Sequence, residues 1–190
     1  MSQAYALLWW IPVGAGSRVV PYTSRLWERA EALVNRRRPR ALFHAALEIV
    51  TGDERFLVEM APAWGVPAPV RGVVATGPVA LTTLGRSHFF RYEVRSWKDG
   101  VLPDREWAVG GPRRIELSGS QAEEMLQAVP RVPRLIWGRR TRGSREMWNS
   151  NSLIAWLMHE GGIDATQFSP PSEGWAPGWS TGIAVATHPL

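Results

Sequence analysis

The sequence predicts an α+β fold in which an antiparallel sheet packs against a helix. Apolar runs of strand length are separated by turn signals, and Phe89–Trp97 alternates cleanly between apolar and polar residues, as a half-buried strand does. The runs 41–50 and 55–60 are joined by residues 51–54, a sequence typical of a β-hairpin. A helical pattern of apolar residues over 153–158 supplies the helix.

The first strand is expected at Ala4–Val13, where Pro12 and Gly14 end an apolar run at a length normal for a strand. Two adjacent tryptophans in this run would also suit an anchor at a membrane surface. The run is too short to span a bilayer, and no basic segment precedes it as in a secretory signal. We therefore expect a buried strand, no transmembrane segment and a cytoplasmic protein.

The other elements are read from caps, prolines and glycines. Residues 1–190 are expected to form a single domain, because 45% hydrophobic residues suit one sizeable core. The end of the chain, 169–190, is rich in Pro, Gly and Trp and is expected to be an irregular C-terminal arm. Further expected elements are a helix at 23–36, a loop at 62–78 with a short strand at 70–75, a turn at 98–100, a loop at 103–112, and a helix at 121–128 capped by Ser118 or Ser120.

Composition excludes several classes of site. The chain has no cysteine, so disulfides, thiolate metal sites and a catalytic thiol are ruled out. Its four histidines show no metal-ligand spacing, and we expect no metal and no cofactor. The net charge is +5; of 22 basic residues Lys98 is the only lysine, which leaves 21 arginines. The densest run, 36–40, has no aromatic or polar partners nearby, so we expect no nucleic-acid partner.

A polar cluster at the start of the last helical pattern is the most informative segment. Asn149, Ser150, Asn151 and Ser152 are all residue types that cap helices, and they run directly into the apolar helix. The hydroxyl of Ser150 would lie where backbone donors and the positive end of the helix dipole converge, a place that favours a developing negative charge. The residues alone leave two interpretations open, a well-capped helix or a nucleophile.

The strand expected at 41–50 carries a second polar feature. His44 lies on the face opposite the apolar residues of this strand, beside a small alanine. With a hairpin turn near Gly52, Glu59 is expected roughly opposite residues 44–46, on the face of His44. Its carboxylate would hold the imidazole in one tautomer and stabilise the protonated form. The alternative is a surface His/Glu pair on a half-exposed sheet.

These residues resemble a known superfamily. Residues 149–157 (NSNSLIAWL) are similar to the D-C-S-G-[LF]-V-x-[YW]-[VL] helix start of NlpC-type papain-like hydrolases, with Ser150 at the catalytic cysteine and Asn149 at the preceding aspartate. They also resemble the N-C-E-H-F segment of the lecithin–retinol acyltransferase branch, a circular permutation of that fold. In the permuted branch the catalytic histidine comes first, on a strand, as His44 does here. A polar residue on the partner strand orients that histidine in the family, and Glu59 matches its place.

The chain also resembles a group of uncharacterised actinobacterial proteins that share an MWNSNS-type helix start, here 147–152, and a PGW-type ending, here 177–179. The chain departs from the papain-like pattern in having serine for cysteine, and a serine hydroxyl needs a base to take its proton during attack. The resemblance implies that His44 is this base, as in a Ser-His-acid triad. Oxyanion donors would be the backbone N–H of Ser150 and the side-chain amide of Asn149 or Asn151.

Eleven tryptophans are many for a chain of this length. Most are expected to be core or loop-anchoring residues. Trp64, Trp148, Trp175 and Trp179 are the candidates for an apolar groove, which would suit an acyl chain, an aromatic ligand or a peptide.

Two functions follow from these observations. The first is hydrolysis or transfer of an acyl group at an amide or ester bond, through Ser150 activated by His44 and Glu59. The second is a catalytically inactive papain-like relative that binds a small-molecule, peptide or lipid-like ligand in its cleft. Labelling of Ser150 by an active-site probe distinguishes them.

Overall fold

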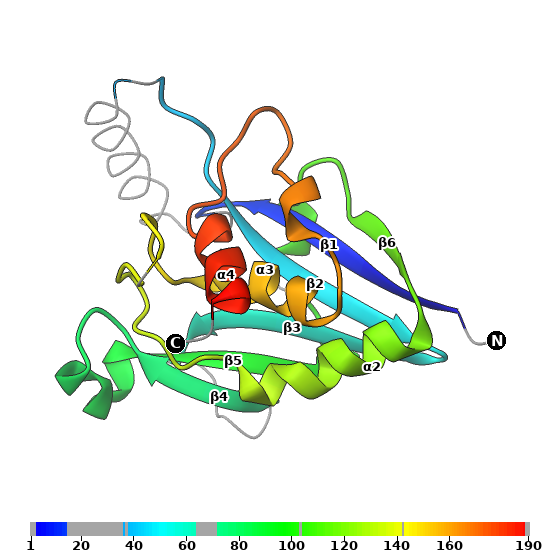
Figure 1. The fold of residues 1–190 in the computed structure, drawn as a ribbon, viewed down its shortest axis with the longest axis horizontal. Helices are drawn as coiled ribbons and strands as arrows, with labels where there is room; N and C mark the ends of the chain where they lie inside the picture. Colours follow the sequence, from blue (N-terminus) through cyan, green and yellow to red (C-terminus); the bar gives the residue numbers. More distant parts are fainter. Residues whose placement is uncertain are drawn as a thin grey trace.

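The computed structural model describes residues 3–14, 36, 38–63, 72–102, 104–141 and 143–188 (Figure 1). In this part of the chain, a six-stranded antiparallel sheet has the strand order β4-β5-β3-β2-β1-β6. The strands are β1 (Ala4–Pro12), β2 (Phe43–Thr51), β3 (Glu54–Pro62), β4 (Val73–Pro78), β5 (Arg91–Lys98) and β6 (Arg113–Leu117).

The α-helices cover one face of the sheet (Figure 1). They are α2 (Gly119–Ala128), α3 (Ser150–Glu160) and α4 (Trp179–Thr187). Short 3₁₀ turns occupy η2 (Thr83–Arg86), η3 (His88–Phe90), η4 (Arg105–Trp107), η5 (Val129–Arg131) and η6 (Ala165–Gln167). Mixed strands and helices around an antiparallel sheet confirm the α+β class predicted from the sequence.

Three segments differ from the sequence prediction. The edge strand β6 was not expected, because it begins with two charged residues, Arg113 and Arg114, which break the alternation of apolar and polar residues typical of a strand. The arm expected to be irregular contains α4, since its Pro/Gly-rich part ends at Gly178 and a helical segment follows. The strand expected at 70–75 runs instead from Val73 to Pro78. Nearly all of the helix expected at 23–36 lies outside the described residues, as does Trp64.

Helix α3 is the centre of the hydrophobic core. Every residue from Ser150 to Met158 is buried, because the sheet covers one side of the helix and α4 the other. The contact with α4 is close: a Cβ on Gly182 would overlap the carbonyl oxygen of Ser152 and lie 2.9 Å from the Cβ of Ala155. On the sheet side, α3 contributes Leu153, Ile154 and Leu157 to a cluster that includes Leu8 and Leu47.

The β2–β3 hairpin opens toward one end of the sheet. Its paired register runs from Thr51↔Glu54 to Leu47↔Val58 and goes no further. Beyond that point β2 stays paired with β1 as far as Phe43↔Pro12, and β3 stays paired with β5 as far as Pro62↔Tyr92. The two strands therefore diverge from their turn, as Figure 1 shows.

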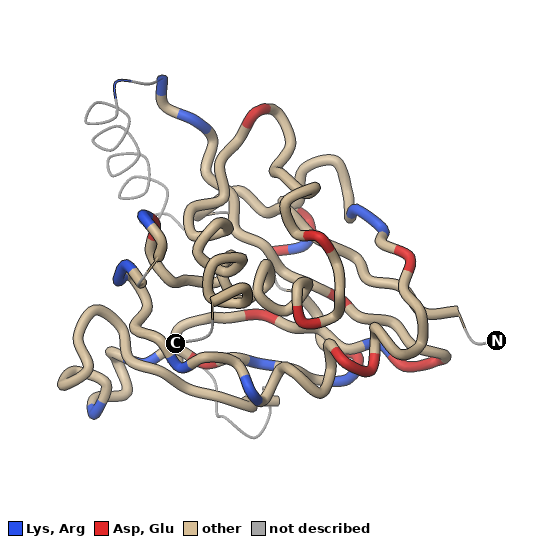
Figure 2. Tube along the Cα trace, in the orientation of Figure 1, with Lys and Arg blue, Asp and Glu red and all other residues tan. Residues whose placement is uncertain are grey.

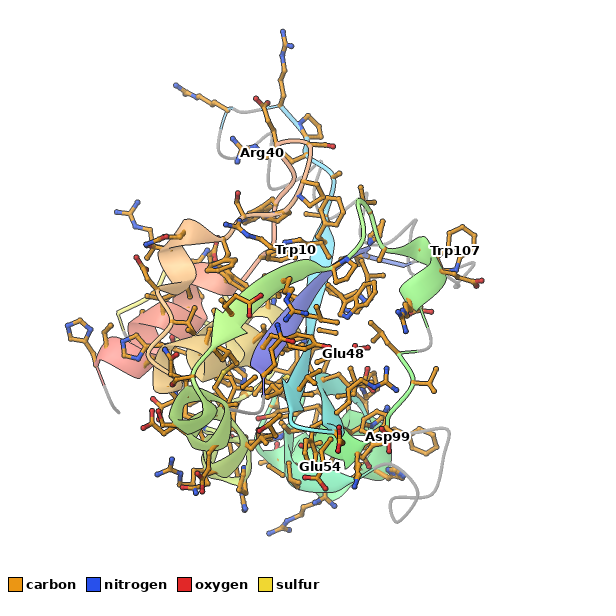
Figure 3. All side chains as sticks on the ribbon, turned by 90° about the vertical axis from the view of Figure 1, so that its right-hand side faces the viewer. Trp10, Arg40, Glu48, Glu54, Asp99 and Trp107 are labelled. Atoms are coloured by element: carbon orange, nitrogen blue, oxygen red, sulfur yellow. The ribbon has the colours of Figure 1, made fainter. Side chains whose placement is uncertain are left out.

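The second face of the sheet is covered by the chain between β5 and β6. Leu102 is buried there, and the guanidinium of Arg105 lies 4.7 Å from the ring centroid of Trp9. Trp107 projects outward at the edge of the molecule, whereas Glu48 lies among the side chains of the sheet (Figure 3). The buried residues of this second cluster are Trp9, Ile11, Ala46, Leu57 and Leu102.

Within the described ranges, no helix is both long and apolar enough to cross a membrane.

Candidate functional site

Asn151 fills the opening between β2 and β3. Its Oδ1 accepts a hydrogen bond from the Ala45 N–H at 2.7 Å, and its Nδ2 donates to the Phe43 carbonyl at 3.0 Å. These are backbone groups of β2 beyond the point where pairing with β3 ends. A side-chain amide can replace a strand there because it offers both a donor and an acceptor. Asn151 thereby joins the start of α3 to the open end of the sheet.

Asn149 and Ser152 cap α3. The Oδ1 of Asn149 accepts from the N–H groups of Asn151 and Ser152, at 2.9 and 3.3 Å, and the Ser152 hydroxyl oxygen accepts from the Asn149 N–H at 3.1 Å. Asn149 Nδ2 also donates to the Pro177 carbonyl at 2.7 Å, and the Ser152 hydroxyl donates to the Gly178 carbonyl at 2.7 Å. This capping box ties the helix start to the C-terminal segment.

Ser150 differs from its three polar neighbours. It is the first residue of α3 and only 9% exposed, yet its hydroxyl makes no hydrogen bond to any described residue. Its backbone N–H likewise has no acceptor in the described chain. The other polar side chains of the cluster are therefore committed to structure, and the Ser150 hydroxyl is available for another task.

A cavity of about 710 Å³ lies where the hairpin opens. This volume lies within the range of small-molecule binding sites. The cavity takes residues from both faces of the sheet, because the strands have separated there. Its lining comprises Val13, Gly14, Leu42, Phe43, His44, Glu59, Met60, Ala61, Pro62, Arg95, Leu102, Asp104, Trp137, Met147, Asn149, Ser150, Asn151 and Pro177. The structure thus brings together in one cavity all five predicted polar residues, which come from three separate segments of the sequence.

His44 reaches this cavity from β2. Burial lowers the pKa of His44 below its ordinary value, and the negative charge of Asp104 opposes this shift without overcoming it. The imidazole is consequently neutral at neutral pH, which is the state able to accept a proton.

Glu59 shares the cavity with His44, but its carboxylate is held by another residue. Arg95 Nη1 donates to Glu59 Oε1 at 2.9 Å. Burial raises the pKa of the Glu59 carboxyl above its ordinary value, and the Arg95 charge offsets only part of that rise. The carboxylate whose charge acts on His44 is that of Asp104.

The oxyanion donors can be sorted by what their hydrogens already bind. Asn151 Nδ2 donates to two carbonyls, of Phe43 at 3.0 Å and Pro177 at 2.9 Å, and has no hydrogen left. Asn149 Nδ2 donates to one, of Pro177, and keeps a second hydrogen. The donors that remain beside the Ser150 hydroxyl are its own N–H and that second Asn149 hydrogen.

The tryptophans predicted to line a groove mostly have structural positions instead. Trp148 is fully buried in the main core. Trp179 lies 5.0 Å, ring centroid to ring centroid, from Trp10, and its Nε1 donates to the Ala165 carbonyl at 2.9 Å. Of the tryptophans that the structure describes, Trp137 lines the large cavity.

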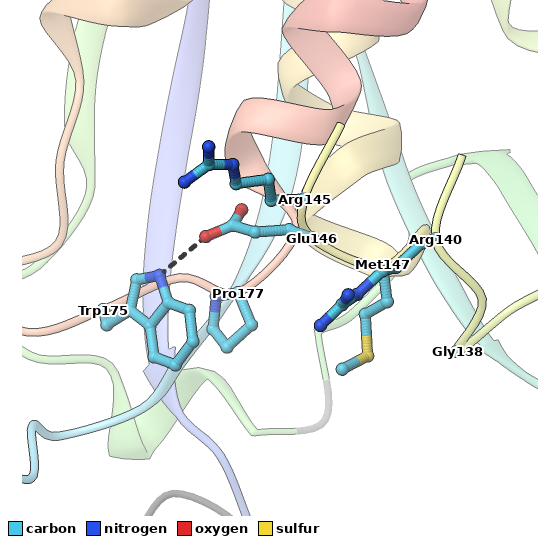
Figure 4. A pocket seen from close by; sticks show the side chains of 7 residues that line it. All are labelled: Gly138, Arg140, Arg145, Glu146, Met147, Trp175 and Pro177. Carbon is cyan, nitrogen blue, oxygen red and sulfur yellow. Dashed lines mark hydrogen bonds between the residues drawn. The ribbon is translucent and has the colours of Figure 1, made fainter. Parts of the chain in front are cut away.

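Trp175 lines a second, smaller cavity of about 160 Å³ (Figure 4). Glu146 organises this place: its carboxylate accepts from Trp175 Nε1 at 3.1 Å, the Gly178 N–H at 2.9 Å and the Ser180 hydroxyl at 2.7 Å. Glu146 therefore anchors the C-terminal segment that also holds Asn149 and Asn151. The smaller cavity is lined by Gly138, Arg140, Arg145, Glu146, Met147, Trp175 and Pro177.

The charges of the molecule are dispersed. Figure 2 shows basic and acidic segments scattered along the described chain, with no element carrying most of the basic residues. Among the described residues, no group of three or more His, Asp or Glu side chains is placed to hold a metal ion.

Two charged residues of the cavity, Asp104 and Arg95, were not identified from the sequence. Asp104 belongs to a loop whose path across the second face depends on tertiary packing, and no local pattern marks it. Arg95 faces Glu59 across the β3–β5 ladder, and this pairing of opposite charges could have been found from the alternation of β5 once the register was known.

Comparison with known proteins assigns the chain to no family. The chain matches no protein-family model, and no curated protein and no solved structure matches it.

Proposed function

We propose that the chain is a hydrolase or acyltransferase that acts on an amide or ester bond, with Ser150 as nucleophile and His44 as general base. We further propose that its fold is a circular permutation of the papain-like fold. The observation that carries the proposal is the unbonded Ser150 hydroxyl, which lines the same cavity as a neutral histidine.

The reaction would proceed in two steps. The Ser150 oxygen attacks the carbonyl carbon while His44 takes the hydroxyl proton, and the carbonyl oxygen becomes negative. The Ser150 N–H and the free Asn149 hydrogen donate to this oxygen. His44 then returns the proton to the leaving amine or alcohol, which leaves an acyl-serine. Water or an acceptor alcohol or amine removes the acyl group in the second step.

Asp104 would act on His44 through charge. A negative charge near the ring stabilises the imidazolium that forms during attack, the role that the resemblance assigned to Glu59. Since Glu59 is engaged by Arg95, we propose Asp104 as the acidic member and Glu59 as part of the cavity wall.

Ligand binding without catalysis is the second candidate, and a specific observation favours it. Apolar side chains, among them Phe43, Met60, Leu102 and Trp137, make up more than half of the residues that line the cavity. Such a lining binds an apolar ligand whether or not a reaction follows.

A fluorophosphonate probe separates the two. We expect the wild-type protein to gain one phosphonyl group by intact-mass spectrometry, and Ser150→Ala to gain none. Ser120→Ala is the matched control, because Ser120 also lies in the first turn of a helix but is exposed and outside the cavity. Labelling that persists in Ser150→Ala, or none in the wild type, would reject the enzymatic proposal; in the latter case binding remains.

A further inference from the structure

The charged side chains of the large cavity differ in whether the protein already pairs them. Among the described residues, four side chains that carry or can acquire charge line it: His44, Glu59, Arg95 and Asp104. A ligand can use such a charge only where the protein has not already paired it.

Arg95 offers no unpaired positive charge. Its Nε donates to Glu93 at 3.2 Å, its Nη1 to Glu59 at 2.9 Å and its Nη2 to the Pro62 carbonyl at 3.1 Å. All three guanidinium nitrogens are thus engaged, and two carboxylates surround one cation. Arg105, which follows Asp104 in the chain, is not a lining residue, and its guanidinium lies over the ring of Trp9.

The carboxylates, in contrast, keep oxygen atoms without a partner in the described chain. Asp104 makes no side-chain hydrogen bond at the start of η4 and none to any other described residue. Glu59 uses Oε1 for Arg95, which leaves Oε2 without a partner in the described chain. The two carboxylates are close enough for the Asp104 charge to raise the pKa of Glu59. Glu59 is buried and Asp104 half-buried, so their like charges repel, and a cation between them would relieve that repulsion.

A further unpartnered group lies in the same cavity, independent of the carboxylates. Ser150 is buried to the extent that only 9% is exposed, and its hydroxyl makes no bond within the described chain. Because Ser150 lines the cavity, a ligand bound there can supply the hydrogen-bond partner that its hydroxyl lacks in the described chain.

We propose that the ligand of this cavity is an apolar molecule with an ammonium group, bound with its cation against Asp104 and Glu59 and its apolar part against the Leu102 and Met60 side of the wall. This inference rests on the proposed function, because it names the substrate class of the same cavity. It disfavours fatty-acid-like anions, which would meet two carboxylates and, among the described lining residues, no unpaired cation. The net charge of +5 would favour an anionic ligand. The proposal instead follows the charges that line the cavity.

The test uses three probes of equal chain length: n-octylammonium, n-octanol and n-octanoate. Their binding is measured by isothermal titration calorimetry on the full-length Ser150→Ala protein, in which no acyl chemistry at Ser150 can occur. We expect octylammonium to bind about tenfold or more tighter than octanol, the order expected of a partly shielded ion pair, and octanoate to bind weakest. Fluorophosphonate labelling of the wild type is scored separately, so each proposal can fail without the other.

Substitution of each carboxylate tests whether it causes the preference for octylammonium. Asp104→Asn should lower the octylammonium affinity severalfold and leave the octanol affinity unchanged, and Glu59→Gln should do the same. Glu106→Gln is the matched control, because Glu106 lies two residues from Asp104 but is exposed and outside the cavity. If Glu59→Gln fails to fold through loss of its pair with Arg95, Asp104→Asn decides alone. Equal binding of octylammonium and octanol, tighter binding of octanoate, or no binding of any probe would overturn the proposal.

Discussion

Asn149 and Ser150 are adjacent polar residues with different surroundings, and this contrast is measurable. Asn149→Ala removes the acceptor that caps α3, so we expect the free energy of unfolding to fall by about 1–2 kcal/mol. Ser150→Ala removes a hydroxyl without a partner in the described chain and should change it by less than about 0.5 kcal/mol. Urea denaturation of both variants measures the difference. A cost for Ser150→Ala equal to that of Asn149→Ala would show that Ser150 has a structural role.

Asp104 and Glu59 are the two candidates for the carboxylate that stabilises protonated His44. The titration of this histidine distinguishes them. The Asp104 charge raises the pKa of His44, so Asp104→Asn should move the titration midpoint to lower pH. Glu59→Gln should leave the midpoint in place, because Glu59 is paired with Arg95. NMR of the imidazole ring, with the His44 signal assigned from His44→Gln, follows both. A shift caused by Glu59→Gln alone would restore Glu59 as the acidic partner.

At the scale of elements, the start of α3 depends on Asn151. Asn151→Ala would leave the Ala45 N–H and the Phe43 carbonyl without the side-chain amide that pairs them, while the Pro177 carbonyl keeps Asn149 as a donor. We expect a loss of about 3 kcal/mol in the free energy of unfolding. Gln127→Ala, an exposed amide on α2, is the control and should change it by less than about 0.5 kcal/mol. Thermal and urea unfolding report both values. Equal, small effects would mean that the open hairpin does not need the amide.

The packing of α4 on α3 depends on Gly182. A Cβ there meets the backbone of Ser152, which cannot move without disturbing the cap of α3, so Gly182→Ala should destabilise the protein by about 1–3 kcal/mol. Gly119→Ala is the matched control: Gly119 is helical too, but a Cβ there meets nothing within 4 Å. Comparison of the two melting temperatures is the measurement. A neutral Gly182→Ala would show that the two helices are not tightly packed.

Sequence reasoning succeeded where a short-range pattern determines the structure. The β2–β3 hairpin follows from its turn, and the start of α3 follows from four capping residues before an apolar stripe. The placement of His44 and Glu59 on one face follows from the period of a strand. These features need no knowledge of the rest of the chain.

The features that were missed depend on distant contacts. No local pattern shows that β2 and β3 stop pairing on the N-terminal side of Leu47. This separation depends on Asn151, which bonds to Ala45 in β2 although 106 positions separate the two residues in the sequence. The same holds for Asp104, which is brought to His44 by the path of a loop. Helix α4 was not predicted, because the segment before it is rich in Pro, Gly and Trp and the whole arm was therefore expected to be irregular.

The whole molecule combines a dispersed positive charge with an acidic, largely apolar cavity. The cavity exists because the sheet opens at one end, and the opening is stabilised because α3 inserts its polar start there. The stabilising residues, Asn149, Asn151 and Ser152, surround Ser150 but do not bond to its hydroxyl. Under the proposed mechanism, the same helix start supports the fold and presents the nucleophile.

The rate of Ser150 phosphonylation as a function of pH tests the central claim most directly. Burial keeps the pKa of His44 below its ordinary value, and only the neutral ring can accept the hydroxyl proton. Protonation as the pH falls therefore inactivates the base. The rate should rise with pH through a single ionisation below about pH 6.5 and be level by about pH 7 to 8, and His44→Gln should abolish this dependence together with most of the rate. A rate that increases steadily with hydroxide, without a plateau and equally in His44→Gln, would contradict activation of Ser150 by His44.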